Sequence, residues 1–139
     1  MSAVADFLIR PFQNTKETPV PESNVRLHEL LDYVRQGRIM DAMREFYADD
    51  VVMTEPAYGE TVGLAANLDR EEKFVASVAE FKNFETPAIA VGDNVGLYEN
   101  VMDWIDTDGN AIHVEQTVVQ QWNAEGKIVH ERFYYDTGK

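Results

Sequence analysis

Residues 111–136 read AIHVEQTVVQQW, then NAEG, then KIVHERFYYD. Each apolar-rich run is long enough for a β-strand, and the four polar residues between them, 123–126, are typical of a tight turn. This segment therefore predicts a long antiparallel hairpin. One face of the hairpin combines ionisable and apolar side chains, which indicates the wall of a pocket more than a plain core. The members of this face are His113, Glu115, Val119, Glu131, Phe133 and Tyr135.

Upstream of the hairpin, the spacing of apolar residues predicts three helices. The first helix begins at Ser23 as N-cap, follows the i, i+3, i+4, i+7 pattern and ends at Gly37, and a shorter helix covers residues 39–47. Asn67 is the predicted N-cap of the third helix. The buried stripe of that helix is expected to be Phe74, Val75, Val78 and Phe81. The predicted strands are residues 51–54, 88–92, 95–106, 111–122 and 127–136, with 58–63 as a loop or a brief strand.

Helices that come first and an antiparallel sheet that comes late define the α+β class. We expect a cone-shaped, curved, mostly antiparallel sheet that encloses helices and a pocket. Residues 23–139 are long enough for one domain with a real core. Residues 1–22 contain Pro11, Pro19 and Pro21, and are predicted to form an extended N-terminal arm or a loose leader.

The composition excludes several classes of partner. The net charge is −13 and the chain has no cysteine, so it repels nucleic acid and anionic membranes and lacks thiol chemistry. No apolar run approaches the ~20 residues of a membrane span, and the N-terminus lacks the basic start of a secretory signal. We therefore expect a cytoplasmic protein with no nucleic-acid or membrane partner.

Several short motifs carry a family resemblance. FYADDVV at 46–52 follows the second predicted helix, Gly63 precedes the third, and GKIV at 126–129 leads to RFYYD at 132–136. With this order of elements, residues 23–139 resemble the nuclear transport factor 2-like (cystatin-like) superfamily, and most closely its SnoaL-like polyketide cyclase branch. The superfamily includes ketosteroid isomerases, polyketide cyclases and scytalone dehydratases as well as binding proteins, so the resemblance implies a fold and leaves the function open.

A partial resemblance to limonene-epoxide hydrolase rests on PAYG at 56–59 and on the same RFYYD run. That resemblance implies a water molecule held by Tyr, Asn and Asp, together with an Asp–Arg pair. The corresponding water-holding positions here are Met53, Glu55 and Phe133, and Val101 replaces the Arg. Asp103 could match one acid of the pair. These departures argue against epoxide hydrolysis by the same mechanism.

The comparison with the hydrolase places Phe133 toward the cavity, and side chains alternate across a strand. The cavity-facing set is then Val129, Glu131, Phe133, Tyr135, His113, Glu115, Thr117, Val119, Gln121, Glu99, Val101, Asp103 and Ile105. A one-residue shift of register would swap the faces. The pocket would then be lined by Tyr98, Met102, Trp104, Gln116, Trp122, His130, Arg132 and Tyr134 instead.

Two carboxylates on paired strands are the leading catalytic candidates. Glu115 and Glu131 would repel each other in a partly dry cavity, which raises at least one pKa and makes a usable general acid or base. Asp103 and Glu55 could complete an acidic cluster. The alternative is that these side chains pair with a neighbouring Arg or Lys or reach solvent.

Other candidates would bind a ligand. The polyketide cyclase resemblance implies a His–Asp couple, for which His113 and Asp103 are the counterparts, although an exposed histidine at the rim is the alternative. Tyr58 and Tyr135 could donate hydrogen bonds to a ligand or pack in the core. Glu99 is a further wall candidate. Without an HxH or HExxH pattern we expect no metal site, and no cofactor motif is present.

Two functional hypotheses from different classes remain. The first is a cofactor-free acid–base enzyme, of isomerase, cyclase, dehydratase or hydrolase type, acting on an apolar carbonyl or hydroxyl compound. The second is a protein that binds a small molecule or a partner without catalysis. On the first choice of register, the outer face of the sheet carries apolar residues that predict a homodimer. These are Trp104, Trp122, Tyr134 and Val118.

Overall fold

The computed structural model describes residues 22–138 and shows three helices and six strands. The helices are α2 (Glu22–Arg35), α3 (Ile39–Phe46) and α4 (Leu64–Ala76). The strands are β1 (Tyr47–Glu55), β2 (Gly59–Val62), β3 (Val78–Gly92), β4 (Val95–Asp106), β5 (Ala111–Trp122) and β6 (Ile128–Tyr134). The predicted arm over residues 1–22 lies outside the described part of the chain, apart from Glu22 at the start of α2.

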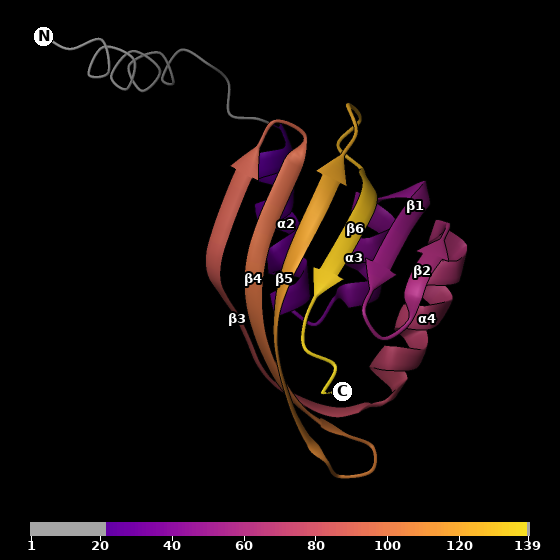
Figure 1. Ribbon diagram of the computed structural model, residues 1–139, viewed down its shortest axis with the longest axis vertical. Helices are drawn as coiled ribbons and strands as arrows, with labels where there is room; N and C mark the ends of the chain where they lie inside the picture. The colour runs from indigo at the N-terminus through magenta and orange to yellow at the C-terminus, as the bar shows by residue number, and fades with distance from the viewer. Residues whose placement is uncertain (1–21, 139) are drawn as a thin grey trace, which may run out of the picture.

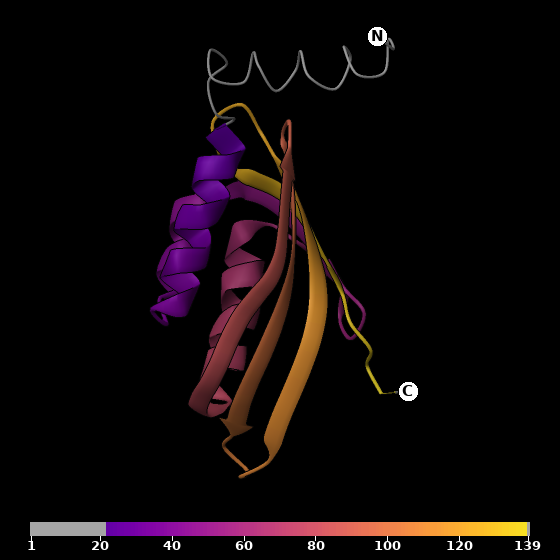
Figure 2. The same ribbon diagram turned by 90° about the vertical axis from the view of Figure 1, so that its left-hand side faces the viewer.

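The six strands form one curved, open sheet in the order β2-β1-β6-β5-β4-β3 (Figure 1). All neighbouring strands are antiparallel except β1 and β6, which are parallel. The helices cover one face of the sheet and leave the other bare, as the edge-on view shows (Figure 2). This arrangement confirms the predicted α+β class and the curved sheet that encloses helices.

The core lies between the helices and the covered face of the sheet. Leu27, Leu30 and Leu31 of α2 are fully or almost fully buried, as the i, i+3, i+4 spacing predicts. They pack in one cluster with Val118 of β5. Gly96 allows the close approach of α2, because a Cβ added there would lie 3.1 Å from the Leu27 Cδ2 atom. No helix of the described residues is long and apolar enough to cross a membrane.

The third helix differs from its prediction at both ends. It begins after Gly63, whose φ of 94° favours glycine, so Asn67 lies inside the helix and does not cap it. The helix ends at Ala76, and the chain continues as β3 from Val78, ten residues earlier than predicted. The reason is tertiary: β3 pairs with β4 along its length, and the pairing shifts register between Glu85 and Ala88, around the single proline of the strand.

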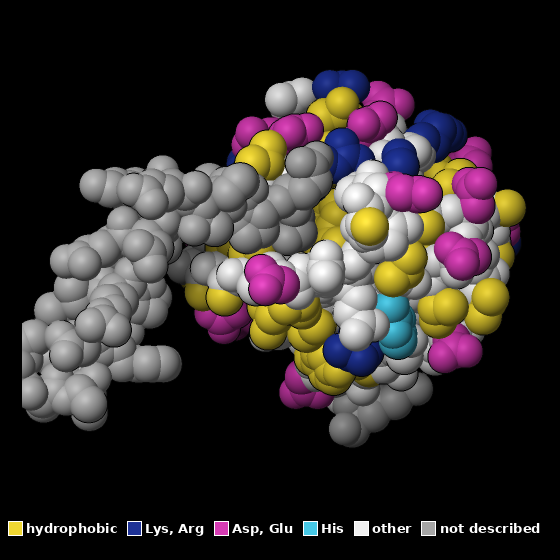
Figure 3. Space-filling view, turned by 90° about the horizontal axis from the view of Figure 1, so that it is seen from above, with side chains coloured by type: hydrophobic (Ala, Val, Ile, Leu, Met, Phe, Trp, Pro, Cys, Tyr) yellow, Lys and Arg dark blue, Asp and Glu magenta, His cyan; other side chains and the backbone are white. Residues whose placement is uncertain are grey.

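Charge is spread over the molecule. The view from above shows Asp and Glu side chains separated by apolar and neutral atoms at that end of the protein (Figure 3). The net charge of −13 therefore does not form a single acidic patch on this face.

Candidate functional site

A cavity of about 710 Å³ lies between the helices and the covered face of the sheet. This volume is within the range of pockets that bind small organic molecules. Helices α2, α3 and α4 line one side, and the inner faces of the strands line the other. The apolar part of the wall includes Met43, Phe74, Phe84, Tyr98, Trp104 and Phe133.

Glu131 of β6 lies on this wall and is only 1% exposed. The Tyr47 hydroxyl donates a hydrogen bond to Glu131 Oε1 at 2.6 Å, and the Gln120 amide donates to Oε2 at 2.5 Å. Burial raises the pKa of Glu131 to about 7, although both hydrogen bonds favour the ionised form and oppose the rise. At neutral pH this carboxyl group is therefore present in both protonation states, as a general acid–base group requires.

Local structure explains how these three side chains meet. Gln120 and Glu131 are directly paired across β5 and β6, and Tyr47 begins β1, which runs parallel to β6. Tyr47 is buried, and burial together with the charge of Glu131 holds its pKa well above the ordinary value. Tyr47 therefore stays a phenol that donates a hydrogen bond.

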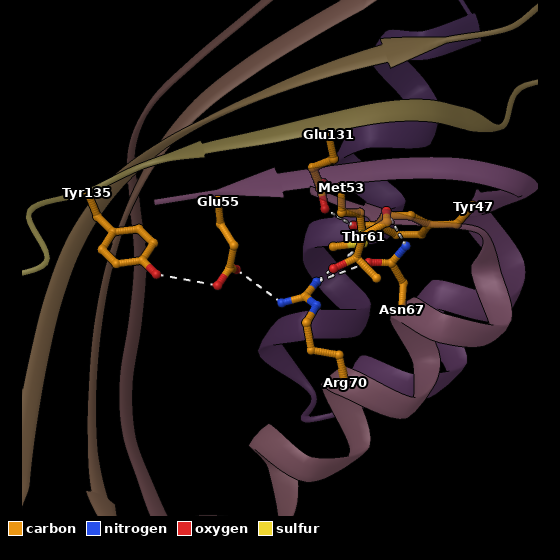
Figure 4. Close-up of polar contacts among 8 residues, drawn as sticks. All are labelled: Tyr47, Met53, Glu55, Thr61, Asn67, Arg70, Glu131 and Tyr135. Carbon is orange, nitrogen blue, oxygen red and sulfur yellow. Dashed lines mark hydrogen bonds and ion pairs between the residues drawn. The ribbon is translucent and has the colours of Figure 1, made fainter. Parts of the chain in front are cut away.

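A second cluster of polar side chains lies between β1 and α4 (Figure 4). Arg70 of α4 donates a hydrogen bond to Glu55 Oε2 at 3.1 Å, and the Tyr135 hydroxyl donates to Glu55 Oε1 at 3.4 Å. Asn67 Oδ1 accepts a hydrogen bond from Arg70 at 3.2 Å. The Asn67 amide also donates to the carbonyl oxygens of Thr61 and Gly63, which ties β2 to the first turn of α4. Asn67 thus positions the guanidinium group beside Glu55.

Five of the predicted site residues line the cavity. They are Glu131, Glu55, Tyr58, Phe133 and Tyr135. The predicted facing of Glu131, Phe133 and Tyr135 is therefore correct. Val129, the fourth residue predicted to face inward on this strand, does not line the cavity, because the β5–β6 pairing shifts beside it. Tyr58 lies in the turn between β1 and β2, and it is largely exposed even though it borders the cavity.

The predicted facing of the other five residues is wrong. They are Glu115, Asp103, Glu99, His113 and Val119, and they lie on the face of the sheet away from the helices. The cause is the register of the last hairpin: Val118 pairs with Phe133, and the pairing shifts between Gln121 and Trp122. This shift places even-numbered residues of β5 beside odd-numbered residues of β6. The alternative faces stated above are thus correct for β4 and β5.

The same register corrects the predicted outer apolar surface. Val118, Trp104 and Trp122 are buried on the covered side, and Tyr134 alone of the four predicted residues is on the outer face, 54% exposed. The exposed residue Leu97 also lies on the outer face, opposite Val119 on the neighbouring strand.

The His–Asp couple forms on the uncovered face. His113 Nδ1 lies 2.6 Å from Asp103 Oδ1, and His113 Nε2 lies 3.3 Å from Glu115 Oε2. The hydrogen bond to Asp103, followed by that to Glu115, raises the pKa of His113. The hydrogen bonds of His113 and Asn83 lower the pKa of Asp103. This cluster is open to solvent and has no access to the cavity.

Sequence reasoning missed several polar residues of the wall. Arg70, Glu71 and Asn100 line the cavity and were not among the candidates. Neither was Gln120, which is buried and donates a hydrogen bond to Glu131. Burial, followed by the charge of Glu55, raises the pKa of Glu71, while Arg70 opposes the rise. Gln116 was named only for the alternative register. The described residues contain no group of three or more His, Cys, Asp or Glu side chains that could hold a metal ion.

A curved sheet with helices on one face and a cavity between them defines a class of small-molecule pocket folds. The sequence model of the SnoaL-like domain matches residues 27–131 of this chain, and the chain belongs to that family. A comparison with curated proteins found no sequence match.

Solved structures share this fold. A nuclear transport factor 2-like protein of unknown function from Burkholderia pseudomallei has a TM-score of 0.74 at 13% identity, over 86% of this chain and 94% of that one. A protein from Mesorhizobium loti, named as a SnoaL-like polyketide cyclase, has a TM-score of 0.68 at 19% identity, over 81% and 97%. TerC, co-crystallised with polyporic acid, has a TM-score of 0.71 at 10% identity, over 84% and 93%. At these identities the likeness shows the fold alone.

Proposed function

We propose that this protein is a cofactor-free acid–base enzyme that acts on an apolar small molecule bearing a carbonyl or hydroxyl group. The observation that carries the proposal is Glu131: a carboxyl group on the wall of an apolar cavity, almost fully buried, with a pKa of about 7. A titratable group poised near neutral pH in a cleft is the usual mark of a proton-transfer site.

In this mechanism, ionised Glu131 removes a proton from a carbon next to the ligand carbonyl and returns it at the same or another position. Tyr47 and Gln120 hold the carboxylate in place through their hydrogen bonds. Tyr98 lines the cavity, and burial raises its pKa well above the ordinary value, so it remains a phenol. Its hydroxyl group can stabilise the negative charge that develops on the carbonyl oxygen. Isomerase, cyclase and dehydratase outcomes begin from such a step, whereas in a hydrolase the same carboxylate would take its proton from the attacking water.

The test is deuterium exchange into the methyl group of 4-acetylbiphenyl in D₂O, followed by NMR. We expect the protein to accelerate exchange, and Glu131→Gln to reduce the acceleration about 10²- to 10⁴-fold, the usual contribution of a general base. Glu115→Gln is the matched control on the uncovered face and should leave the rate unchanged. An unchanged rate in Glu131→Gln would reject the assignment.

A binding protein without catalysis is the second candidate. Both oxygens of Glu131 already accept hydrogen bonds, so this carboxyl group can also serve as a fixed polar anchor for a ligand. The cavity wall is otherwise largely apolar, and TerC shares the fold and was crystallised with a small molecule. Binding of 4-acetylbiphenyl without accelerated exchange would favour this candidate.

We also propose a homodimer through the uncovered face of the sheet. The exposed apolar residues Leu97 and Tyr134 support this, since helices cover only the opposite face (Figure 2). Sedimentation at micromolar concentration should give a dimer, and Tyr134→Asp should shift it toward monomer. A wild-type protein that sediments only as a monomer would reject the dimer.

A further inference from the structure

The cavity wall contains a second polar position that the proton-transfer step does not use. Asn100 of β4 and Gln116 of β5 are paired directly across the two strands, and both line the cavity. Asn100 is 3% exposed, and its Oδ1 atom is buried without a hydrogen-bond partner among the described residues. A buried acceptor without a partner lowers the stability of the folded protein. A bound ligand that donates a hydrogen bond to this atom would remove that penalty.

The strand register gives the separation between this amide pair and Glu131. Gly96 and Gln120 are level with Glu131 across β4, β5 and β6, and Asn100 and Gln116 lie four residues further along their strands. Four residues of a strand span about 13 Å. The row between them consists of Tyr98, Val118 and Phe133. This row, which is apolar apart from the Tyr98 hydroxyl group, separates Glu131 from the amide pair along the sheet.

The chemistry of the amide pair selects the ligand group. An amide oxygen accepts and an amide nitrogen donates, so together these two side chains suit a hydroxyl group, which does both. An anionic group is disfavoured, because the wall carries four acidic side chains besides Glu131 and two basic ones. The acidic residues are Glu55, Glu71, Asp106 and Asp108, and the basic residues are Arg70 and Lys73.

We propose that Asn100 and Gln116 form a hydroxyl-binding subsite for an elongated, apolar, uncharged ligand. The two protein positions are about 13 Å apart along the strands, so the hydroxyl group lies at the end of the ligand away from the group that reacts at Glu131. The assignment of Glu131 as the place where the ligand reacts rests on the proposed function. The preference of Asn100 and Gln116 for a hydroxyl group does not, since it concerns binding at the other end of the cavity.

The test compares two probes that differ by one hydroxyl group, 4-acetyl-4′-hydroxybiphenyl and 4-acetylbiphenyl. The ketone and the hydroxyl of the first probe lie at opposite ends of two coupled rings. We expect the wild-type protein to bind the hydroxylated probe about fivefold more tightly, as measured by calorimetry, which is the size of one net hydrogen bond. Asn100→Leu should bring the two Kd values together, because it removes the acceptor and keeps a side chain that branches at the same atom.

Further variants separate a subsite from a folding effect. Asn100→Asp keeps an acceptor and should keep the hydroxyl preference, and Gln116→Met should weaken it. Glu131→Gln should keep the preference while it loses deuterium exchange. Equal Kd values in the wild-type protein, or a preference that survives in Asn100→Leu, would overturn this inference alone. Failure of both probes to bind would overturn the inference and the pocket assignment together.

Discussion

The two faces of the sheet hold the same kind of side chain in opposite states. Glu131 is 1% exposed on the covered face, and burial raises its pKa to about 7. On the uncovered face the side chain of Glu115 is 72% exposed, and the pKa of Asp103 is lowered by its hydrogen bonds. Each of these carboxylates lies on a strand of one sheet. Their surroundings, rather than their residue type, therefore decide which of them can exchange protons near neutral pH.

The comparison also separates two roles of hydrogen bonding. Around Asp103 and His113 the partners stabilise the ionised forms, and desolvation opposes them too weakly to reverse either shift. Around Glu131 the hydrogen bonds from Tyr47 and Gln120 also favour the ionised form. The desolvation penalty is larger, however, so the pKa of Glu131 rises. Burial of this carboxyl group thus lowers the stability of the fold, and functional sites often carry such a cost.

The largest expected effect on stability comes from Glu131→Gln. In the wild-type protein, Glu131 has a pKa of about 7 when folded and near 4.5 when unfolded. The folded state therefore binds the proton more tightly, and the contribution of Glu131 to stability is lost as the pH rises between these values. At pH 8 the Gln variant should be more stable than the wild type by about 3 kcal/mol.

Denaturant unfolding from pH 4 to pH 9 measures this difference. The two proteins should have similar stability near pH 4, where Glu131 is protonated in both the folded and the unfolded state, and should diverge as the pH rises. Glu115→Gln is the control, since its side chain is mostly exposed. A constant difference between Glu131→Gln and wild type at all pH values would contradict the buried-carboxylate account.

Tyr47→Phe should have an intermediate effect. The variant removes the hydrogen bond that Tyr47 donates to Glu131 Oε1 and should cost about 1 kcal/mol of stability. That bond lowers the pKa of Glu131, so its loss should raise the pKa further and move the pH–rate profile of deuterium exchange to higher pH. A profile that moves to lower pH would show that Tyr47 does not stabilise the carboxylate.

Asp103→Asn should have the smallest effect on activity, but it should clearly change the pKa of His113. The Asp103 carboxylate is the first cause of the raised pKa of His113, so the variant should lower that pKa toward its ordinary value. Because the folded pKa is raised, any stability from His113 is present at low pH and is lost as the pH rises through the folded pKa. NMR titration of the His113 ring measures the shift. The exchange rate should not change, and a loss of activity would place the cluster in the reaction after all.

Local pattern was sufficient for some elements and insufficient for others. The apolar spacing of Leu27, Leu30 and Leu31 predicted the buried stripe of α2, because a helix that packs on a sheet must present one apolar face. Val78 and Phe81 continued a helical pattern but lie in β3. Their strand exists because β4 offers a long partner, and pairing between distant segments overrides local propensity.

The sequence alone determined the α+β class, the last hairpin, the family resemblance and the inward face of β6, with Glu131, Phe133 and Tyr135 on the cavity. The α+β class and the hairpin follow from periodicity and turn chemistry within short segments. The inward face of β6 follows from the resemblance to limonene-epoxide hydrolase together with the alternation of side chains along a strand. Tertiary structure decided which faces of β4 and β5 line the cavity, and so placed Asn100 and Gln120 inside and Asp103 and His113 outside. The physical reason is that side chains alternate with a period of two, so a single register shift beside the β5–β6 turn reverses every assignment on the strands beyond it.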